Sequence, residues 1–480
     1  MKKILVLLFL ASQVSTAQLA FPNAEGFGRN ATGGRGGTII HVTNRNDSGS
    51  GSLREALSTT GTRTIVFDVG GDWDLQSELR IGTTNSGTNL SYSNVTIAGE
   101  TAPSPGVNLL NYGISVYAEN VIISYVTIGL GNENTDNGGT EADALRVRNW
   151  GTNGALSDFF FTNLHLRWSS DENFSLQSQS ATNTINNVTL QNSILSEPTN
   201  YSGYGMLLHD NIRTTSIIGN YFAFNRERNP LIGRGTEEEI EVINNVFYGY
   251  QYGAVITYNS YVDFIGNIYK NIPADKADGY SMDSSNNSFT ELQPEDGELY
   301  VADNFQVGAA DYALYGPRVT ARAQASRSLT TSNVTTWAST VAEIEARVLN
   351  DNVGNSLYRD ATADRVLADY TNGTGAIFNS TDPSTLSTGW DYKTGTTKTA
   401  GFDSDNDGMD DVYEIEIWGD ITTTNSPWAY TDGTLVSDFD SWTNHEKTRF
   451  VKLDVTTTIP VPEVPVISTP KASNVMFINN

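Results

Sequence analysis

A short repeat in the middle of this chain restricts its fold more than any other feature. From about residue 93 to residue 270, strand-like runs of Val, Ile, Phe and Thr recur beside small or amide residues. The last five runs share an Asn, at Asn163, Asn192, Asn220, Asn245 and Asn267, with spacings of 29, 28, 25 and 22 residues. A period in the twenties with β-branched strands is typical of stacked supersecondary units. The repeat therefore predicts an all-β fold, a right-handed parallel β-helix.

The recurring asparagines are expected to be structural. A residue that recurs once per coil stacks above its predecessor, and stacked amides satisfy one another's donors and acceptors. A two-sheet sandwich is the competing fold, but its strands usually recur every 8–12 residues.

Composition excludes several classes of function. The 480 residues contain no cysteine, so disulfides, thiolate metal sites and a cysteine nucleophile are impossible. The formal net charge of −26 is opposite to that of a protein that binds nucleic-acid phosphates.

Residues 1–17, with Lys2 and Lys3 before an apolar run, predict a signal peptide and export to the periplasm or the extracellular space. No other stretch is apolar and long enough to span a membrane.

Motifs near the amino terminus resemble a known family. They include AFPNAEGFG at 20–28, TGGRGG at 32–37, HVTNRND at 41–47 and GSLREA at 51–56. Further matches follow in order: TIVFD at 64–68, TIAGETA at 96–102, DAL at 143–145, WSSDE at 168–172, NRERNP at 225–230 and YRDATAD at 358–364. Over residues 20–375 the chain resembles the pectate lyases of polysaccharide lyase family 1, as found in Bacteroidetes-type bacteria.

The resemblance implies a parallel β-helix and calcium-assisted β-elimination of uronic-acid polymers. In that reaction a base removes the C5 proton beside the C6 carboxylate, and the C4 glycosidic oxygen leaves. Neutralising the carboxylate is the main electrostatic task, and Ca²⁺, a hard cation that binds several oxygens, suits it. Such a partner would be an acidic polysaccharide, and the enzyme is expected to be a monomer.

The same resemblance assigns site residues. Glu141 and Asp143 match the first acidic calcium ligands, and Asp171 matches the next. At Ser175 the family usually has another Asp, and Thr162-Asn163 replaces a common Asp-His pair.

Other positions are expected to contact the substrate. No Lys occurs in residues 200–215, where the family has a substrate-binding one. Tyr204, His209 and Arg213 lie in that segment as replacement contacts, although His209 fits an ordinary surface or turn histidine equally well.

By the resemblance Arg228 is the Brønsted base, and Arg226 and Arg234 bind substrate carboxylates. Arginine is normally protonated, so the base role needs a strongly perturbed environment or a relayed hydroxide. The alternative is that some of these arginines pair with acids such as those at 237–239.

Two other functions stay open at this point. A β-helix hydrolase would need carboxylates that converge from neighbouring coils, for which Asp143 and Asp171 are candidates. Adjacent Asp171 and Glu172 are not expected to share one bond, because successive strand side chains point to opposite faces. A glycan-binding protein that has lost its activity is the other alternative, motivated by the departures at Ser175 and Thr162-Asn163 and by the missing lysine.

The carboxyl-terminal third is organised differently. We expect the β-helix domain to cover 18–395, with a helix at 341–349 that packs on or caps it. A small region at 396–455 contains a twelve-residue calcium loop with Asp403, Asp405, Asp407, Asp411 and Glu414 as ligands. Residues 456–480 form a Pro-rich linker or tail.

Overall fold

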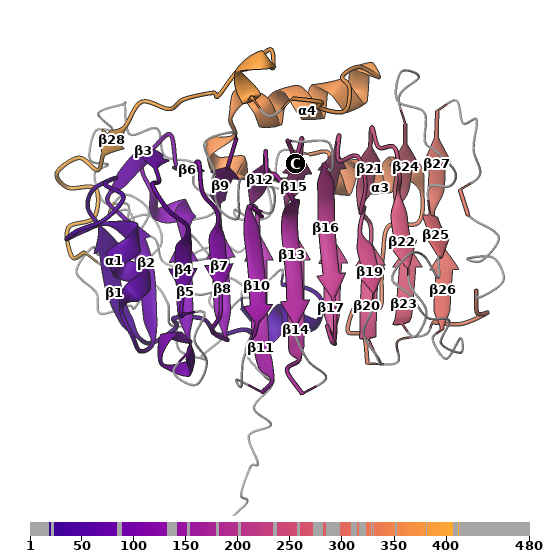
Figure 1. Ribbon diagram of the computed structural model, residues 1–480, viewed down its shortest axis with the longest axis horizontal. Coiled ribbons are helices and arrows are strands. Elements are labelled where there is room, and N and C mark those ends of the chain that lie inside the picture. Colours follow the sequence, from indigo (N-terminus) through magenta and orange to yellow (C-terminus); the bar gives the residue numbers. More distant parts are fainter. Residues whose placement is uncertain are drawn as a thin grey trace, which may run out of the picture.

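Three sheets wind around one long axis in the computed structural model (Figure 1). The structure describes residues 19–20, 24–83, 89–131, 142–150, 154–178, 182–199, 203–233, 238–256, 260–271, 282–284, 298–308, 314–315, 323–327, 329, 331–350, 353–380, 382–406 and 411.

Each complete coil contributes one strand to each sheet. Sheet 1 contains β1 (Thr38–Val42), β2 (Arg63–Phe67), β5 (Val95–Ala98), β8 (Val121–Ser124), β11 (Leu156–Thr162), β14 (Ile185–Gln191), β17 (Thr215–Ile218), β20 (Glu238–Ile243), β23 (Ser260–Ile265) and β26 (Leu299–Ala302). Sheet 2 contains β4 (Leu79–Ile81), β7 (Ile114–Val116), β10 (Leu145–Asn149), β13 (Glu172–Ser178), β16 (Tyr204–His209), β19 (Leu231–Gly233), β22 (Ala254–Ile256) and β25 (Met282–Ser284).

Sheet 3 contains β3 (Val69–Asp74), β6 (Val107–Leu110), β9 (Val126–Gly129), β12 (His165–Arg167), β15 (Ile194–Ser196), β18 (Tyr221–Ala223), β21 (Val246–Tyr248), β24 (Ile268–Lys270), β27 (Phe305–Val307) and, antiparallel to β3, β28 (Thr396–Thr397). Every other pairing between the described strands is parallel, and the predicted parallel β-helix is confirmed.

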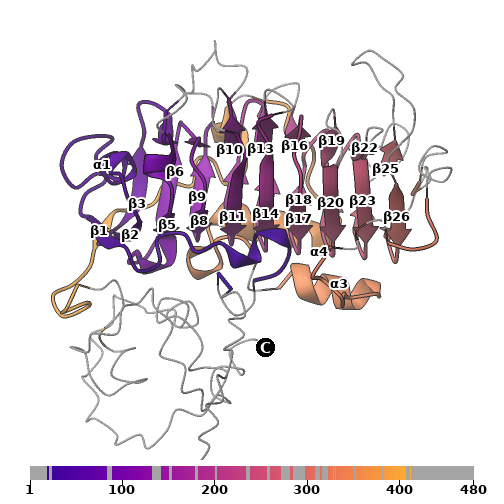
Figure 2. The ribbon, with the colours of Figure 1, turned by 90° about the horizontal axis from the view of Figure 1, so that it is seen from below.

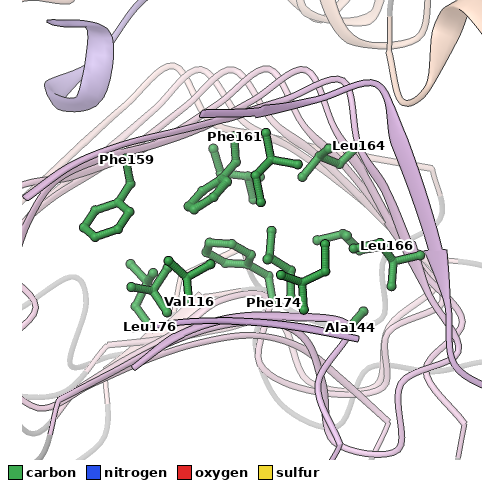
Figure 3. Close-up of a cluster of buried hydrophobic side chains, with 14 of the residues drawn as sticks. Val116, Ala144, Phe159, Phe161, Leu164, Leu166, Phe174 and Leu176 are labelled. Atoms are coloured by element: carbon green, nitrogen blue, oxygen red, sulfur yellow. The ribbon is translucent and has the colours of Figure 1, made fainter. Parts of the chain in front are cut away.

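The interior of the coil is filled by the inward side chains of all three sheets. Phe159 and Phe161 on β11 face Phe174 and Leu176 on β13 across the core (Figure 3). Phe160, between the first two, points outward and is covered by the amino-terminal segment at Ala24 and Ala31. This alternation is the period-2 pattern of strands. On β13 of sheet 2 it turns Phe174 and Leu176 into the core, so Ser175 between them points outward.

The predicted asparagine ladder is present, with two of its members assigned wrongly. Asn220 Nδ2 donates to Asn245 Oδ1 at 3.0 Å, and Asn245 Nδ2 donates to Asn267 Oδ1 at 3.1 Å. Asn304 extends the ladder, accepting from Asn267 Nδ2 at 2.8 Å.

Asn163 and Asn192 lie one position before the ladder, where the backbone is left-handed, with φ of 54° and 49°. Gly219 and Asn244 occupy the same position in later coils, with φ of 68° and 52°. Asn and Gly tolerate that conformation, so two adjacent positions both favour Asn for different reasons.

Few helices accompany the strands in the described chain. They are α1 (Leu53–Ser58), α3 (Val341–Val348) and α4 (Ala361–Asn372), with 3₁₀ turns η1 (Phe27–Asn30), η2 (Asn89–Tyr92), η3 (Gly99–Thr101), η5 (Ser356–Tyr358) and η6 (Pro383–Thr385). The helix predicted at 341–349 is therefore confirmed as α3, which begins with a capping box formed by Thr340 and Glu343. No helix among the described residues has the length and apolar character needed to cross a bilayer.

Helices α3 and α4 pack on the side of the coil, against sheet 3 (Figure 2). Ile344 and Val348 of α3 and Val366 and Tyr370 of α4 join one buried cluster with Tyr221 and Tyr248.

At the start of α4, Asp360 caps the helix through Ala363 N and forms an ion pair with Arg167 Nη1 at 2.7 Å. Both side chains are buried, so this pair fixes α4 to β12.

Candidate active site

The candidate site lies where several strands of sheet 2 begin. Glu172 and Tyr204 are register partners at the first positions of β13 and β16. Two residues before β10, Asp143 Oδ1 accepts a hydrogen bond from Glu172 N at 3.2 Å. The loop before β19 adds Glu227 beside Tyr204, followed by Arg228. Residues far apart in sequence are thereby stacked coil upon coil.

Three carboxylates converge at this position. Asp143, Asp171 and Glu172 each offer an oxygen, and these oxygens lie within 4.8 Å of one another. Asp143 and Glu172 are buried and Asp171 is half-buried. Like charges so close favour either a shared proton or a cation.

The surroundings of Glu172 fit a cation. Its Oε1 forms an ion pair with Arg228 Nη1, whereas its Oε2 is buried without a hydrogen-bond partner. Burial, together with the charges of Asp143 and Asp171, raises the pKa of the Glu172 carboxyl well above its usual range, and Arg228 opposes the rise. A divalent ion coordinated by oxygens would supply the missing partner and relieve the repulsion, so the donor set suits Ca²⁺.

Ser175 changes how the charge is distributed. Its Oγ donates to Asp143 Oδ2 at 2.6 Å, and Gln177 Nε2 donates to Ser175 Oγ at 3.1 Å. The hydroxyl thus holds Asp143 in place without adding a negative charge. With Glu172 beside Asp143 and Asp171, the site contains three carboxylates even though Ser stands at 175.

Arg228 is held from two sides. Its guanidinium carbon lies 3.5 Å from the centroid of the Tyr204 ring, and its Nη1 contacts Glu172. Its backbone is left-handed, with φ of 57°, which directs the side chain from the loop towards β13 and β16. A planar cation between an aromatic face and a carboxylate has a well-defined position.

The structure brings together only some of the residues expected from the sequence. Asp143, Asp171, Tyr204 and Arg228 meet at the site. Arg226 lies in the same loop but donates to Gln251 Oε1 at 2.6 Å and to Asn379 Oδ1. Glu141 and Arg234 lie outside the described residues.

His209 and Arg213 lie towards the other end of β16 from Tyr204, where the register partner of His209 is Gln177, which donates to Ser175 Oγ. His209 ends β16, five residues from Tyr204 and thus roughly 16 Å along the strand. Its Nδ1 lies 2.9 Å from Asp210 Oδ2. Arg213 follows in the turn before β17 and is half-buried.

Sequence reasoning missed Glu172. The expectation that Asp171 and Glu172 point apart assumed that both lie on one strand, and it is wrong because β13 begins at Glu172. Asp171 belongs to the preceding turn, where alternation does not apply. The available signal was the spacing between Glu172 and the buried Phe174. Residues two apart on a strand point to the same face, so Glu172 is on the side of β13 that faces the core.

The second predicted metal site is described only in part. Asp403 Oδ2 lies 3.4 Å from Lys398 Nζ, Asp405 is exposed, and Asp411 accepts from Ser404 N at 2.7 Å. Asp407 and Glu414 lie outside the described residues. Asn406 O contacts His41 Nε2 at 3.1 Å, so this segment lies against β1.

Comparison with known proteins gives consistent relatives. A protein of Aspergillus oryzae named probable pectate lyase C is 30% identical over 432 residues, which cover 87% of this chain and 92% of the relative. A protein of the same name from Aspergillus fumigatus is 29% identical over 449 residues, covering 90% of this chain and 94% of the relative. These relatives are fungal, so they do not support the expected Bacteroidetes-type subgroup. No family model matches the chain.

Among solved structures, the major allergen from cedar pollen superposes with a TM-score of 0.51. Its sequence is 17% identical, and the match covers 69% of this chain and 92% of the allergen. At that identity the likeness concerns the fold alone.

Proposed function

The chain belongs to the pectate lyase family and is a polysaccharide lyase, and from that premise we propose that it cleaves a pectate-like uronate polymer by calcium-assisted β-elimination. The observation that supports this proposal most is the group of three carboxylates beside Arg228. When bound there, calcium would neutralise the substrate carboxylate and so favour removal of the adjacent proton.

Different residues of the chain would bind the cation and remove the proton. Asp143, Asp171 and Glu172 would hold the cation. Arg228, in its neutral form, would take the C5 proton as the C4–O bond breaks, which leaves a double bond between C4 and C5, and the departing oxygen would take a proton from water to become a hydroxyl. In the structure the guanidinium contacts Glu172, so it must separate from that carboxylate to reach the C5 proton. Tyr204 limits where the guanidinium can move.

Metal removal tests the reaction directly. Incubation with polygalacturonate and calcium is expected to produce the ultraviolet absorbance of an unsaturated uronate, and excess chelator should abolish it. The assay should be repeated on other uronate polymers to define the substrate. New reducing ends without absorbance would show hydrolysis, and glycan binding without any product would show a protein that has kept only its binding function.

Glu172 provides a test of the metal site that does not depend on turnover. Glu172→Gln is expected to weaken calcium binding by about 10-fold to 100-fold, because it removes one of three charges at the cluster. Isothermal titration calorimetry measures the affinity. Glu227→Gln is the matched control, since Glu227 is a half-buried carboxylate two coils beyond Glu172 that is not part of the cluster. Equal affinities of the two variants would remove Glu172 from the site.

Three further features belong to the same proposal. Export is supported by the sequence pattern of residues 1–17, and a structural calcium site by the spacing of acids at 403–414. Arg226, in the loop of Arg228, and Arg234 are proposed to contribute positive charge towards the substrate.

A further inference from the structure

A group of buried, uncharged side chains connects β13 to the loop that carries Arg228. Asn173, the second residue of β13, donates from Nδ2 to Asn225 Oδ1 at 3.0 Å. Asn225 lies three residues before Arg228, in the loop between β18 and β19, and its Nδ2 donates to Leu195 O at 3.0 Å. Asn173 and Asn225 are 0% and 1% exposed, so water does not compete for these hydrogen bonds.

The same group of side chains reaches the residues proposed to hold the cation. Ser169 Oγ lies 2.9 Å from Asn173 Oδ1 and 3.2 Å from Asp171 O, so its hydroxyl can donate to either oxygen. Asn173 follows Glu172 directly in the sequence. The hydrogen bonds of Ser169 and Asn173 therefore tie the backbone around Asp171 and Glu172 to the loop of Arg228.

The loop of Arg228 is also closed on itself. Asn229 Nδ2 donates to Asn225 O at 3.1 Å and to Tyr252 O of the following coil at 3.0 Å. Arg228 lies between these two asparagines, and its carbonyl oxygen accepts from Met206 N on β16 at 2.8 Å. Because side-chain hydrogen bonds close the loop, a shift at Asn225 is transmitted to the backbone of Arg228.

Gly205 on β16 leaves the space that this loop occupies. A Cβ atom at position 205 would lie 2.8 Å from Arg228 O and 2.9 Å from Asn229 Oδ1. Cβ atoms do not approach other heavy atoms so closely, so a larger residue would push the loop away from β16. The loop is thus bonded to Asn173 through Asn225 and is in close contact with the backbone of Gly205.

We propose that Asn225 is a positioning residue for the reaction, because it sets where the Arg228 guanidinium lies relative to the carboxylate cluster. The inference rests on the proposed function, which makes Arg228 the base. The amides carry no charge, so they fix the geometry without adding to the charges of Asp143, Asp171 and Glu172. Proton transfer requires the base within hydrogen-bond reach, and a displacement of about 1 Å is enough to slow it strongly.

Asn225→Ala is expected to lower kcat by about 10-fold to 100-fold, while KM is unchanged and calcium affinity does not fall. Then kcat and kcat/KM decrease together, as they do when an interaction of the transition state is lost. The rate of unsaturated uronate formation is measured per mole of folded protein, and calcorimetric titration gives the calcium affinity.

Asn149→Ala is the matched control. Asn149 is another buried amide, and its Nδ2 donates to Gly154 O at 2.6 Å and Thr184 O at 2.9 Å. It ends β10, at the opposite end of that strand from Asp143. A purely structural role of such amides would lower the unfolding midpoint of both variants and the kcat of neither.

Two further variants make the test decisive. Asn173→Ala removes the other partner of the same hydrogen bond, so the double variant with Asn225→Ala should lose less activity than the product of the two single losses. Gly205→Ala displaces the loop from β16, is expected to lower kcat in the same way, and decides the question if Asn225→Ala does not fold. A crystal structure of the folded variant should show Arg228 displaced from Glu172.

Three results would overturn the inference. They are an unchanged kcat in the folded variant, a calcium affinity that falls as far as kcat does, and losses that multiply in the double variant. The ultraviolet assay of the parent protein decides the proposed reaction separately. An active parent whose Asn225 variant keeps its kcat would remove the positioning role alone, whereas a parent that forms no unsaturated product would remove the reaction and the positioning role with it.

Discussion

Replacing Arg228 with lysine is expected to lower kcat by about a thousandfold, while calcium affinity does not fall. Lysine keeps a cation beside the buried Glu172 carboxylate, so the fold and the charge of the site are retained. It lacks the planar guanidinium that lies against Tyr204 and would present a different group to the C5 proton. The measurement is the rate of unsaturated uronate formation at saturating polygalacturonate, with calcium affinity and unfolding midpoint measured in parallel.

Arg347→Lys is the control for that variant, since Arg347 pairs with Glu25 away from the site. If Arg228 served only to pair with Glu172, lysine would preserve most of the activity. An active Arg228→Lys enzyme would therefore contradict the proposed role of Arg228 as the base.

The second large effect concerns stability. Asp360→Ala is expected to reduce the free energy of unfolding by about 3–5 kcal/mol, because it leaves the buried Arg167 without its counterion. It also removes the cap of α4. Urea unfolding monitored by tryptophan fluorescence gives the change in midpoint.

Asp364→Ala on the same helix is the matched control. Its carboxylate is 65% exposed and lies 3.8 Å from Arg359 Nε, so its loss should cost less than about 1 kcal/mol. Adding Arg167→Met to Asp360→Ala should recover part of the stability by removing the unpaired charge. Similar midpoints for Asp360→Ala and Asp364→Ala would show that the buried pair does not hold α4.

Acidification should act on the same contact. Burial alone would raise the pKa of Asp360, but the charges of Arg167 and His165 outweigh it and hold the pKa far below the usual 3.8. A carboxyl with a depressed folded pKa contributes stability above its unfolded pKa and loses it as the pH falls towards the folded value. Unfolding midpoints should therefore decline below about pH 4 in the parent and less steeply in Asp360→Ala.

The fold could be predicted from the sequence because its information is local and repeated. Each coil contains the sequence signals for its own strands and turns, and the number of residues between successive rungs at Asn220, Asn245 and Asn267 is the length of one coil. The errors at Asn163 and Asn192 arose because neighbouring positions of the coil both select Asn, and only the backbone conformation separates them.

The site was less accessible to sequence reasoning because it depends on contacts between coils. The start of β13 decided the role of Glu172, and strand boundaries are the least certain feature of a sequence pattern. The partner of Arg226, Asn379, lies 153 residues away and could not be seen from the motif. The pairing of Arg228 with Glu172 spans 56 residues and was missed for the same reason.

The asparagine ladder has a consequence for how such a chain can change. Successive rungs are 25, 22 and 37 residues apart, yet each amide still meets the next. Insertions and deletions are therefore absorbed by the connections between strands, and the register of the rungs does not drift. Loops other than those that contain Asp143 and Arg228 can be exchanged or lengthened without moving Asp143, Glu172 or Arg228 relative to one another. Substrate preference can thus diversify through loop exchange while the reacting residues keep their geometry.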